Sequence, residues 1–239
     1  MKKIIKILVV IILISLIIGV IACMVLYNKG LLSFYHPNKA EKEGQIKVAC
    51  VGDSVTYGFG ITPWTNNNYP AVLQQMLGDN YCVKNFGYSG RTLQSIGDRP
   101  YINEKLYQET LDYQPDIVIF MLGSNDSKPF NWDKENFMKE YKEVVESYIN
   151  LESKPKVYVI APPPVFEVDG RVKYNIQKDV IANEIVPAVK QLAEEMGLPC
   201  IDMYSVFEGK PELFSDGCHP NIEGAKLFAQ TVYDKVFAE

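Results

Sequence analysis

The chain has 239 residues, which is enough for one α/β domain with a full core and a short appendage. Its aromatic content of 12% and charged content of 22% are those of a folded domain, which excludes an intrinsically disordered protein. Residues 1–44 carry six Lys and two Glu, whereas the remainder carries 18 basic and 27 acidic residues. Because an acidic domain repels phosphate backbones, nucleic acid is not an expected partner.

The N-terminus has the composition of a membrane-spanning segment. Three lysines precede a run of 21 uncharged residues at 7–27. A helix of that length reaches about 31 Å, which matches a hydrocarbon core of about 30 Å. A cleavable signal normally has a shorter apolar region, so we interpret residues 1–27 as an uncleaved membrane anchor. The alternative is a lipoprotein anchored at Cys23, because the residues before it resemble a lipobox, although the apolar run continues beyond it.

The basic residues lie closer to the apolar run on its N-terminal side. This bias favours a single-pass protein of the cell membrane with an extracytoplasmic domain. Residues 28–44 are largely polar and are expected to form a juxtamembrane linker, and residues 45–239 are expected to form the folded domain.

Four cysteines belong to the expected domain, at positions 50, 82, 200 and 218. Since no pair has Cys-x-x-Cys spacing, a zinc or redox site receives little support. Cys50 and Cys82 sit in short apolar runs and are interpreted as buried thiols, and Cys218 likewise.

From residue 46 onward, short apolar runs alternate with longer segments of helical periodicity. Strands are predicted at 46–51, 81–83, 117–122, 157–160 and 199–201, and helices at 69–77, 104–113, 133–151, 176–196 and 222–237. Asp133 is expected to cap the helix at 133–151. Gly197 is expected to end the helix at 176–196, and Pro187 to kink or divide that same helix. This alternation predicts an open parallel sheet covered on both faces, with reacting groups at the carboxyl ends of the strands.

A tight turn follows the first predicted strand, in the sequence Gly52-Asp53-Ser54. Gly52 permits the turn, and Ser54 then begins a helix or turn where its hydroxyl is exposed beside free backbone N–H groups. The alternative is that Ser54 only caps a helix, as most serines after strands do.

A histidine near the C-terminus supplies the base that such a serine would need. The chain has two histidines, His36 in the expected linker and His219 in the domain. A serine hydroxyl becomes nucleophilic near neutral pH only beside a base, and imidazole is the usual one. Asp216 lies three residues before His219 across a glycine, close enough to fold back onto the ring and hold its tautomer. In the alternative interpretation Asp216 merely caps a turn of a surface loop.

Candidate oxyanion donors follow the second and third strands. Acyl transfer needs donors aimed at the developing oxyanion. The N–H of Gly87 and the side-chain amide of Asn125 are expected to join the N–H of Ser54 in this role. Each residue also has an alternative interpretation as a loop residue without a catalytic role. Gly87 would then provide a positive φ, and Asn125 would form an Asx-turn. Asp126 is interpreted as a structural hydrogen-bond acceptor.

Gly-Asp-Ser, a lone Gly after strand two, Gly-x-Asn-Asp after strand three and a C-terminal Asp-x-x-His together resemble the SGNH hydrolase family, also called GDSL esterases and lipases. The resemblance implies a flavodoxin-like three-layer α/β/α fold with a five-stranded parallel sheet and with no metal or organic cofactor. It also implies that Ser54 is the nucleophile, His219 the base and Asp216 its orienting acid, with Ser54, Gly87 and Asn125 forming the oxyanion hole. The nucleophile motif here ends in Val, where the family often has Leu or Ile.

Three aromatic residues near these motifs, Trp64, Tyr88 and Trp132, are expected to line the mouth of the site. Aromatic faces suit sugar rings, although core packing is the commonest fate of an aromatic residue. The stretch at 125–132 is similar to that of bacterial family members grouped with carbohydrate and sialic acid O-acetylesterases. Because no long apolar insertion resembles a lipase lid, we expect a serine ester hydrolase that cleaves small acyl groups, chiefly acetyl, from a glycan through an acyl-enzyme.

Other functions stay open at this point. A lysophospholipase or thioesterase would act on longer acyl chains, and a glycan O-acetyltransferase would use the same triad to pass the acyl group to a hydroxyl. A catalytically silent glycan-binding module is disfavoured, because a decayed site would have lost one of its motifs.

Overall fold

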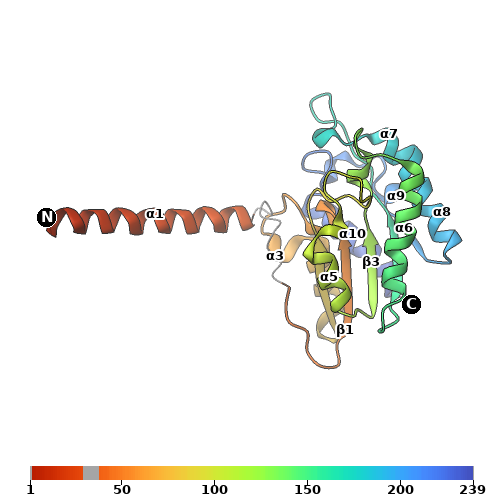
Figure 1. The fold of residues 1–239 in the computed structure, drawn as a ribbon, viewed down its shortest axis with the longest axis horizontal. Coiled ribbons are helices and arrows are strands. Elements are labelled where there is room, and N and C mark those ends of the chain that lie inside the picture. The colour runs from red at the N-terminus through yellow and green to blue at the C-terminus, as the bar shows by residue number, and fades with distance from the viewer. Residues whose placement is uncertain (1, 29–37, 239) are drawn as a thin grey trace.

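The computed structural model describes residues 2–28 and 38–238. Residues 29–37, which include Lys29, His36 and much of the expected linker, lie outside this description. Within the described ranges, helix α1 (Lys2–Asn28) precedes an α/β domain and extends away from it (Figure 1).

Helix α1 is long and apolar enough to cross a membrane. Its segment Leu8–Leu26 has 19 residues with a mean hydropathy of 3.3, and none of this segment is buried against the rest of the described structure. The same properties belong to signal sequences, so the membrane anchor at 1–27 stays a prediction.

Five parallel strands form one sheet in the order β2-β1-β3-β4-β5. The strands are β1 (Ile46–Gly52), β2 (Tyr81–Gly87), β3 (Ile117–Met121), β4 (Lys156–Ala161) and β5 (Cys200–Asp202). This is the predicted flavodoxin-like sheet. Its strand order reverses at β1, so the carboxyl ends of β1 and β3 flank the position where such sheets bind ligands.

Strand β2 is the one whose length the sequence analysis misjudged. Prediction ended it at residue 83, but it continues to Gly87 in parallel register with β1, and Asn85 pairs with Cys50. The polar Asn85 is buried, and its side chain is satisfied there because its amide donates to the carbonyls of Thr56 and Tyr57. A buried polar residue with complete hydrogen bonding does not end a strand.

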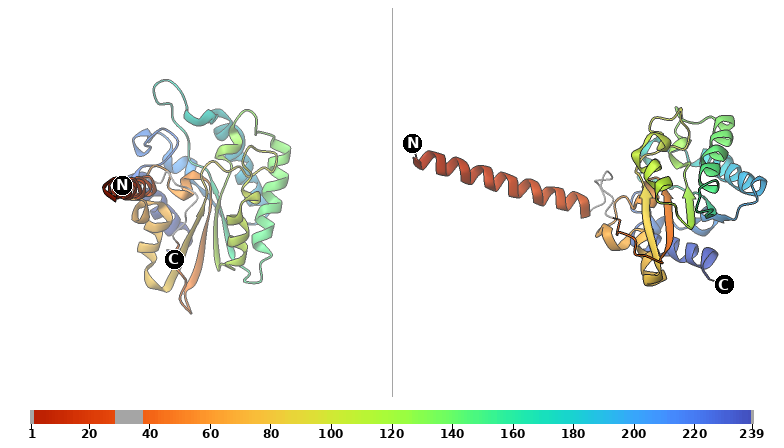
Figure 2. Two further views of the ribbon diagram at one scale, coloured as in Figure 1. Left: turned by 60° about the vertical axis from the view of Figure 1, so that its left-hand side comes forward. Right: turned by 60° about the horizontal axis from the view of Figure 1, so that its bottom comes forward.

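Helices cover both faces of the sheet, as the left view of Figure 2 shows. The covering helices are α4 (Tyr69–Leu77), α9 (Met203–Phe207) and α10 (Ile222–Val236) on one face, and α5 (Lys105–Asp112), α6 (Lys134–Ile149) and α8 (Val186–Glu195) on the other. Along β1, Val48 and Cys50 pack in the first layer, whereas Ala49 and Val51 pack in the second. Successive side chains of a strand point to opposite faces, so the buried run at 48–51 serves both cores.

The predicted helix signals hold in detail. The side chain of Asp133 caps α6 by accepting from Asn136 N, and Gly197 follows α8 with φ +65°. The helix predicted at 176–196 is divided, as Pro187 led us to expect. A short α7 (Lys178–Val180) leads into a π-helical turn, and α8 follows directly with Pro187 as its second residue, so the irregular helical turn lies just before the proline.

Candidate active site

The turn after β1 presents Ser54 at the carboxyl edge of the sheet. A Cβ on Gly52 would lie 2.2 Å from Thr56 Oγ1 and 2.6 Å from the carbonyl oxygen of Met121, so only glycine fits there. The fully buried Asp53 then caps the short helix α2 (Ser54–Tyr57), with its Oδ1 accepting from Val55 N at 3.0 Å. Ser54 is thereby held as the first residue of α2.

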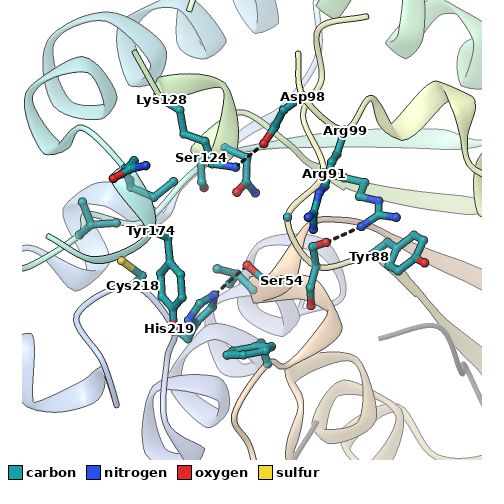
Figure 3. Close-up of a pocket in the computed structure, with 18 of the residues that line it drawn as sticks. Ser54, Tyr88, Arg91, Asp98, Arg99, Ser124, Lys128, Tyr174, Cys218 and His219 are labelled. Atoms are coloured by element: carbon teal, nitrogen blue, oxygen red, sulfur yellow. Dashed lines mark hydrogen bonds and ion pairs between the residues drawn. The ribbon is translucent and has the colours of Figure 1, made fainter. Parts of the chain in front are cut away.

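Ser54, His219 and Asp216 form a chain of hydrogen bonds, of which Figure 3 shows the one between Ser54 and His219. Ser54 Oγ lies 2.9 Å from His219 Nε2, and His219 Nδ1 lies 2.8 Å from Asp216 Oδ2. The other carboxylate oxygen of Asp216 accepts from the backbone N–H groups of Cys218, at 3.0 Å, and of His219, at 2.8 Å. One carboxylate therefore shapes the Asp-x-x-His loop and orients the imidazole ring.

The charge of Asp216 is stabilised by these contacts. Burial alone would raise the pKa of this carboxyl group, but the hydrogen bond from His219, the charge of that ring when it is protonated and the two backbone N–H groups hold it well below its usual range. A carboxylate that stays ionised beside Nδ1 keeps the proton on that nitrogen and leaves Nε2 to accept from the serine.

Tyr174 is a neighbour of this triad that sequence reasoning missed. Its hydroxyl donates to Asp216 Oδ2 at 2.8 Å, and its ring centroid lies 5.3 Å from that of His219. The ring of Phe59 contacts His219 from α2's side, at 4.7 Å between centroids. Partial burial and the bond to Asp216 raise the pKa of Tyr174 to about 12, so its hydroxyl stays a donor near neutral pH. No local motif marks Tyr174, because its role depends on a loop that folds back from β4.

A cavity of about 650 Å³ opens above Ser54. Its walls come from the loops that follow β1, β2, β3 and β4 and from the loop before α10. This arrangement agrees with the expectation that reacting groups gather at the carboxyl ends of the strands. Cys218 also lines the cavity, but burial raises the pKa of its thiol to about 12, so a thiolate there is disfavoured.

Asn125 lines the same cavity, in the turn after β3. Its side-chain Nδ2 lies 3.4 Å from the buried Asp53 Oδ2, which orients the amide next to the serine turn. Its neighbour Asp126 faces away, accepting from the backbone N–H groups of Leu93 and Gln94 at 2.9 Å each. Burial raises the pKa of Asp126 to about 7, and its contacts fit the structural role expected of it.

The expectation for Gly87 is wrong. Gly87 ends β2, its N–H donates to Asn85 Oδ1 at 2.9 Å, and it does not line the cavity. A Cβ there would lie 2.2 Å from Tyr57 N, so glycine is needed for the close approach of α2 to β2. Gly90, three residues later with φ +80°, does line the cavity. Gly87 was expected to follow the strand, but β2 runs on to Gly87, and the first glycine beyond it is Gly90.

Two of the three expected aromatic contacts are also wrong. Trp64 is buried outside the cavity and donates from Nε1 to the carbonyl oxygen of Tyr57 at 2.6 Å. Trp132 packs against the core and donates from Nε1 to Glu184 Oε2 at 2.9 Å. Tyr88 does line the cavity, with the guanidinium carbon of Arg91 3.5 Å from its ring centroid. The indole N–H groups found partners in the fold, which is the usual outcome for a buried Trp.

Comparisons with known proteins identify the family of this chain. The profile of the GDSL-like lipase/acylhydrolase family matches residues 50–227. An acetylxylan esterase from Xylanibacter ruminicola is 37% identical over 215 residues, which cover 81% of this chain and 43% of that protein. This chain thus spans less than half the length of that relative.

Solved structures share the fold over most of the chain. A carbohydrate acetylesterase family member from Sinorhizobium meliloti is 26% identical with a TM-score of 0.60, covering 78% of this chain and 94% of that one. The native aryl esterase of M. smegmatis is 22% identical with a TM-score of 0.65, covering 82% of this chain and 98% of that one. The family profile, matched over most of the α/β domain, shows that this chain belongs to the GDSL-like lipase/acylhydrolase family, a family of carboxylic ester hydrolases.

Proposed function

We propose that this protein hydrolyses acetyl esters on carbohydrate, with Ser54 as the nucleophile. The observation that carries the proposal is the hydrogen-bonded chain from Ser54 Oγ through His219 to Asp216, beside a cavity that Asn125 also lines. The acetylxylan esterase relative and the carbohydrate acetylesterase structure support the choice of an acetyl group on a sugar.

In the proposed mechanism, His219 Nε2 takes the proton of Ser54 Oγ as that oxygen attacks the ester carbonyl carbon. The backbone N–H groups of Ser54 and Gly90 and the side-chain amide of Asn125 stabilise the oxyanion, with Gly90 in the role first expected of Gly87. His219 then gives its proton to the leaving alcohol, which yields an acyl-enzyme. A water molecule repeats the attack and releases the carboxylic acid and free Ser54 Oγ.

The lining of the cavity favours a small acyl group on a polar carrier. Charged side chains of Arg91, Asp98, Arg99 and Lys128 line it. A volume of about 650 Å³ exceeds what an acetyl group fills, and the surplus space beside these groups suits a hydroxyl-rich alcohol better than a long acyl chain.

The test uses the full chain, solubilised in a mild detergent, with p-nitrophenyl acetate, butyrate and octanoate and an O-acetylated monosaccharide as substrates. We expect rates that fall with acyl length, and a loss of at least about 10³-fold in Ser54→Ala. Thermal unfolding of the variant checks that the fold is intact. Equal rates for wild type and Ser54→Ala would refute the proposal. A preference for octanoate would indicate a lipid substrate, and acetyl transfer to an added sugar would indicate a transferase.

The proposal also places the protein at the cell membrane, with α1 as a single span and the domain outside the cytoplasm. The composition of Leu8–Leu26 supports this location. Carbonate extraction of membranes tests it: a spanning helix stays in the pellet in wild type and in Cys23→Ala alike. A wild-type chain shortened to begin at Cys23, beside an uncleaved Cys23→Ala chain, would indicate the lipoprotein alternative, and secretion of a shortened chain would indicate a cleaved signal.

A further inference from the structure

Positive charge is concentrated in the cavity of an otherwise acidic domain. The chain has only three arginines, and two of them, Arg91 and Arg99, line the cavity together with Lys128. Among the described residues, Asp98 is the one acidic residue in the lining of the cavity. Beyond residue 44 acidic residues outnumber basic ones by 27 to 18, so this excess of cations is local.

Two of the three cations are neutralised by neighbours. Arg91 forms an ion pair with Glu104, with its Nη2 2.7 Å from Oε1, and Lys128 Nζ lies 3.2 Å from Asp98 Oδ2. The Asp98 pKa is lowered despite partial burial, because hydrogen bonds from Asn131 and Lys128 and the nearby charges of Lys128 and Arg99 stabilise its carboxylate. Within residues 2–28 and 38–238, Arg99 is in no ion pair and feels Asp98 only through space, so its guanidinium is the cavity cation that no protein carboxylate holds.

The guanidinium of Arg99 lies next to the proposed oxyanion hole. A Cβ built on Gly90 would be 3.6 Å from Arg99 Nη1, so this end of the side chain lies against the Gly90 backbone. Figure 3 shows Arg99 projecting from its loop toward the space above Ser54, on the side of the cavity opposite His219 and Tyr174. A substrate whose ester reaches Ser54 therefore shares the cavity with Arg99.

We infer that Arg99 binds an anionic substituent, a carboxylate or a phosphate, on the sugar from which the acetyl group is removed. A guanidinium presents parallel donors that match such groups bidentately, whereas hydroxyl groups gain less from it. The nearby positive charges of Arg91 and Lys128 raise the potential in the same direction. Arg99 is then a specificity residue, and the inference depends on the proposed deacetylation.

The test compares three methyl glycosides acetylated at the same hydroxyl: glucose, glucuronic acid and glucose 6-phosphate. The readout is the ratio of kcat/KM between each anionic substrate and the neutral one, so that a general loss of activity cancels. For the full chain in detergent at low salt, we expect a ratio of about ten for at least one anionic sugar, because one charge-assisted hydrogen bond strengthens binding by about that factor. Salt at about 0.5 M should lower the ratio, because the guanidinium is exposed to solvent.

Three variants assign the effect. Arg99→Gln should bring the ratio to within about twofold of one, and Arg99→Lys should retain only part of it, because lysine keeps the charge without the fork. Arg171→Gln removes the remaining arginine, which is exposed and outside the cavity lining, and should keep the wild-type ratio. The larger of the two anionic ratios identifies carboxylate or phosphate as the group recognised.

The inference and the proposed function fail in different ways. A wild-type ratio near one, a ratio unchanged by Arg99→Gln, or cleavage of p-nitrophenyl acetate without cleavage of any sugar overturns the inference and leaves the esterase activity standing. Wild-type protein that hydrolyses neither p-nitrophenyl acetate nor the sugars overturns the proposed function, and the inference with it.

Discussion

The two sides of the cavity differ in whether their charged groups have partners within the protein. On the triad wall, where Ser54 and His219 line the cavity, the carboxylate of Asp216 is satisfied by the imidazole, two backbone N–H groups and the Tyr174 hydroxyl. The side chains of His219 and Asp216 are only 10% and 16% exposed. On the cationic wall, formed by Arg91, Arg99 and Lys128, the guanidinium of Arg99 has no carboxylate partner among the described residues.

We expect this difference to separate chemistry from recognition. A hydrogen-bonded, largely buried network holds its groups in one orientation before the substrate arrives, which is what transition-state stabilisation requires. A cation at a cavity wall that has no ion-pair partner in the protein can instead pair with an anionic group of the substrate, and it therefore favours some substrates over others. Changes on the triad wall should therefore slow all esters alike, and changes on the cationic wall should alter the preference between esters.

The largest effect is expected from Asp216→Asn. The amide can hold His219 with its proton on the wrong nitrogen, so Ser54 loses its base, and kcat should fall by about 10⁴-fold. The loss should be the same for neutral and anionic acetylated sugars and for p-nitrophenyl acetate. Steady-state rates on all of them measure this, and a loss confined to one substrate would show that Asp216 acts in recognition.

Asn125→Ala should lower kcat by about 10²–10³-fold with little change in KM, because the amide is expected to bind the oxyanion of the transition state. The Asp53 carboxylate would lose the amide 3.4 Å away, so the unfolding temperature should be measured as well. Full activity in Asn125→Ala would remove this residue from the oxyanion hole.

Asp216 should also make the fold sensitive to acid. Its pKa in the folded protein is lowered, mainly by His219 acting against the cost of burial, relative to about 3.9 in an unfolded chain. The folded state then binds fewer protons, so the stabilisation is complete above about pH 5 and is lost as the pH falls below the unfolded value. The difference in unfolding temperature between wild type and Asp216→Asn should begin to shrink below about pH 5 and keep shrinking through pH 3, and a constant difference would contradict this linkage.

The smallest effect is expected from Glu104→Gln, which removes the counterion of Arg91. With a second unbalanced guanidinium, the cationic wall should favour anionic over neutral sugars by a further factor of about two. The free energy of unfolding should fall by about 1 kcal/mol because a partly buried charged hydrogen bond is lost. Glu109→Gln is the matched control, since Glu109 pairs with the exposed Lys105 and does not line the cavity. An unchanged preference in Glu104→Gln would confine Arg91 to a structural role.

The sheet and the triad were predictable because each depends on local patterns. Buried parallel strands are short apolar runs, and four of the five predicted strands agree with the structure to within one residue at either end. Gly-Asp-Ser and Asp-x-x-His carry their geometry within a few residues, since Asp53 caps the helix of Ser54 and Asp216 bonds the loop of His219. The catalytic roles of these residues remain predictions that the variants above test.

Where the sequence was misread, a partner distant in the chain made the difference. Lys84 and Asn85 look like the end of a strand, but pairing with β1 carries β2 on to Gly87 and moves the cavity glycine to position 90. Trp64 and Trp132 are close to the motifs in sequence, yet Tyr57 and Glu184 hold their indole N–H groups outside the cavity.

By itself, the sequence determined the α/β class, the order of strands and helices, and the residues able to form a Ser-His-Asp triad. These follow from hydrophobic periodicity and from hydrogen bonds that span a few residues. The tertiary structure alone decided which glycine lines the cavity, that Tyr174 bonds Asp216, and that Arg91 and Lys128, but not Arg99, form ion pairs with carboxylates of the described residues. Ion pairs and cavity walls join segments far apart in the chain, and their energies depend on distances that only the folded packing sets.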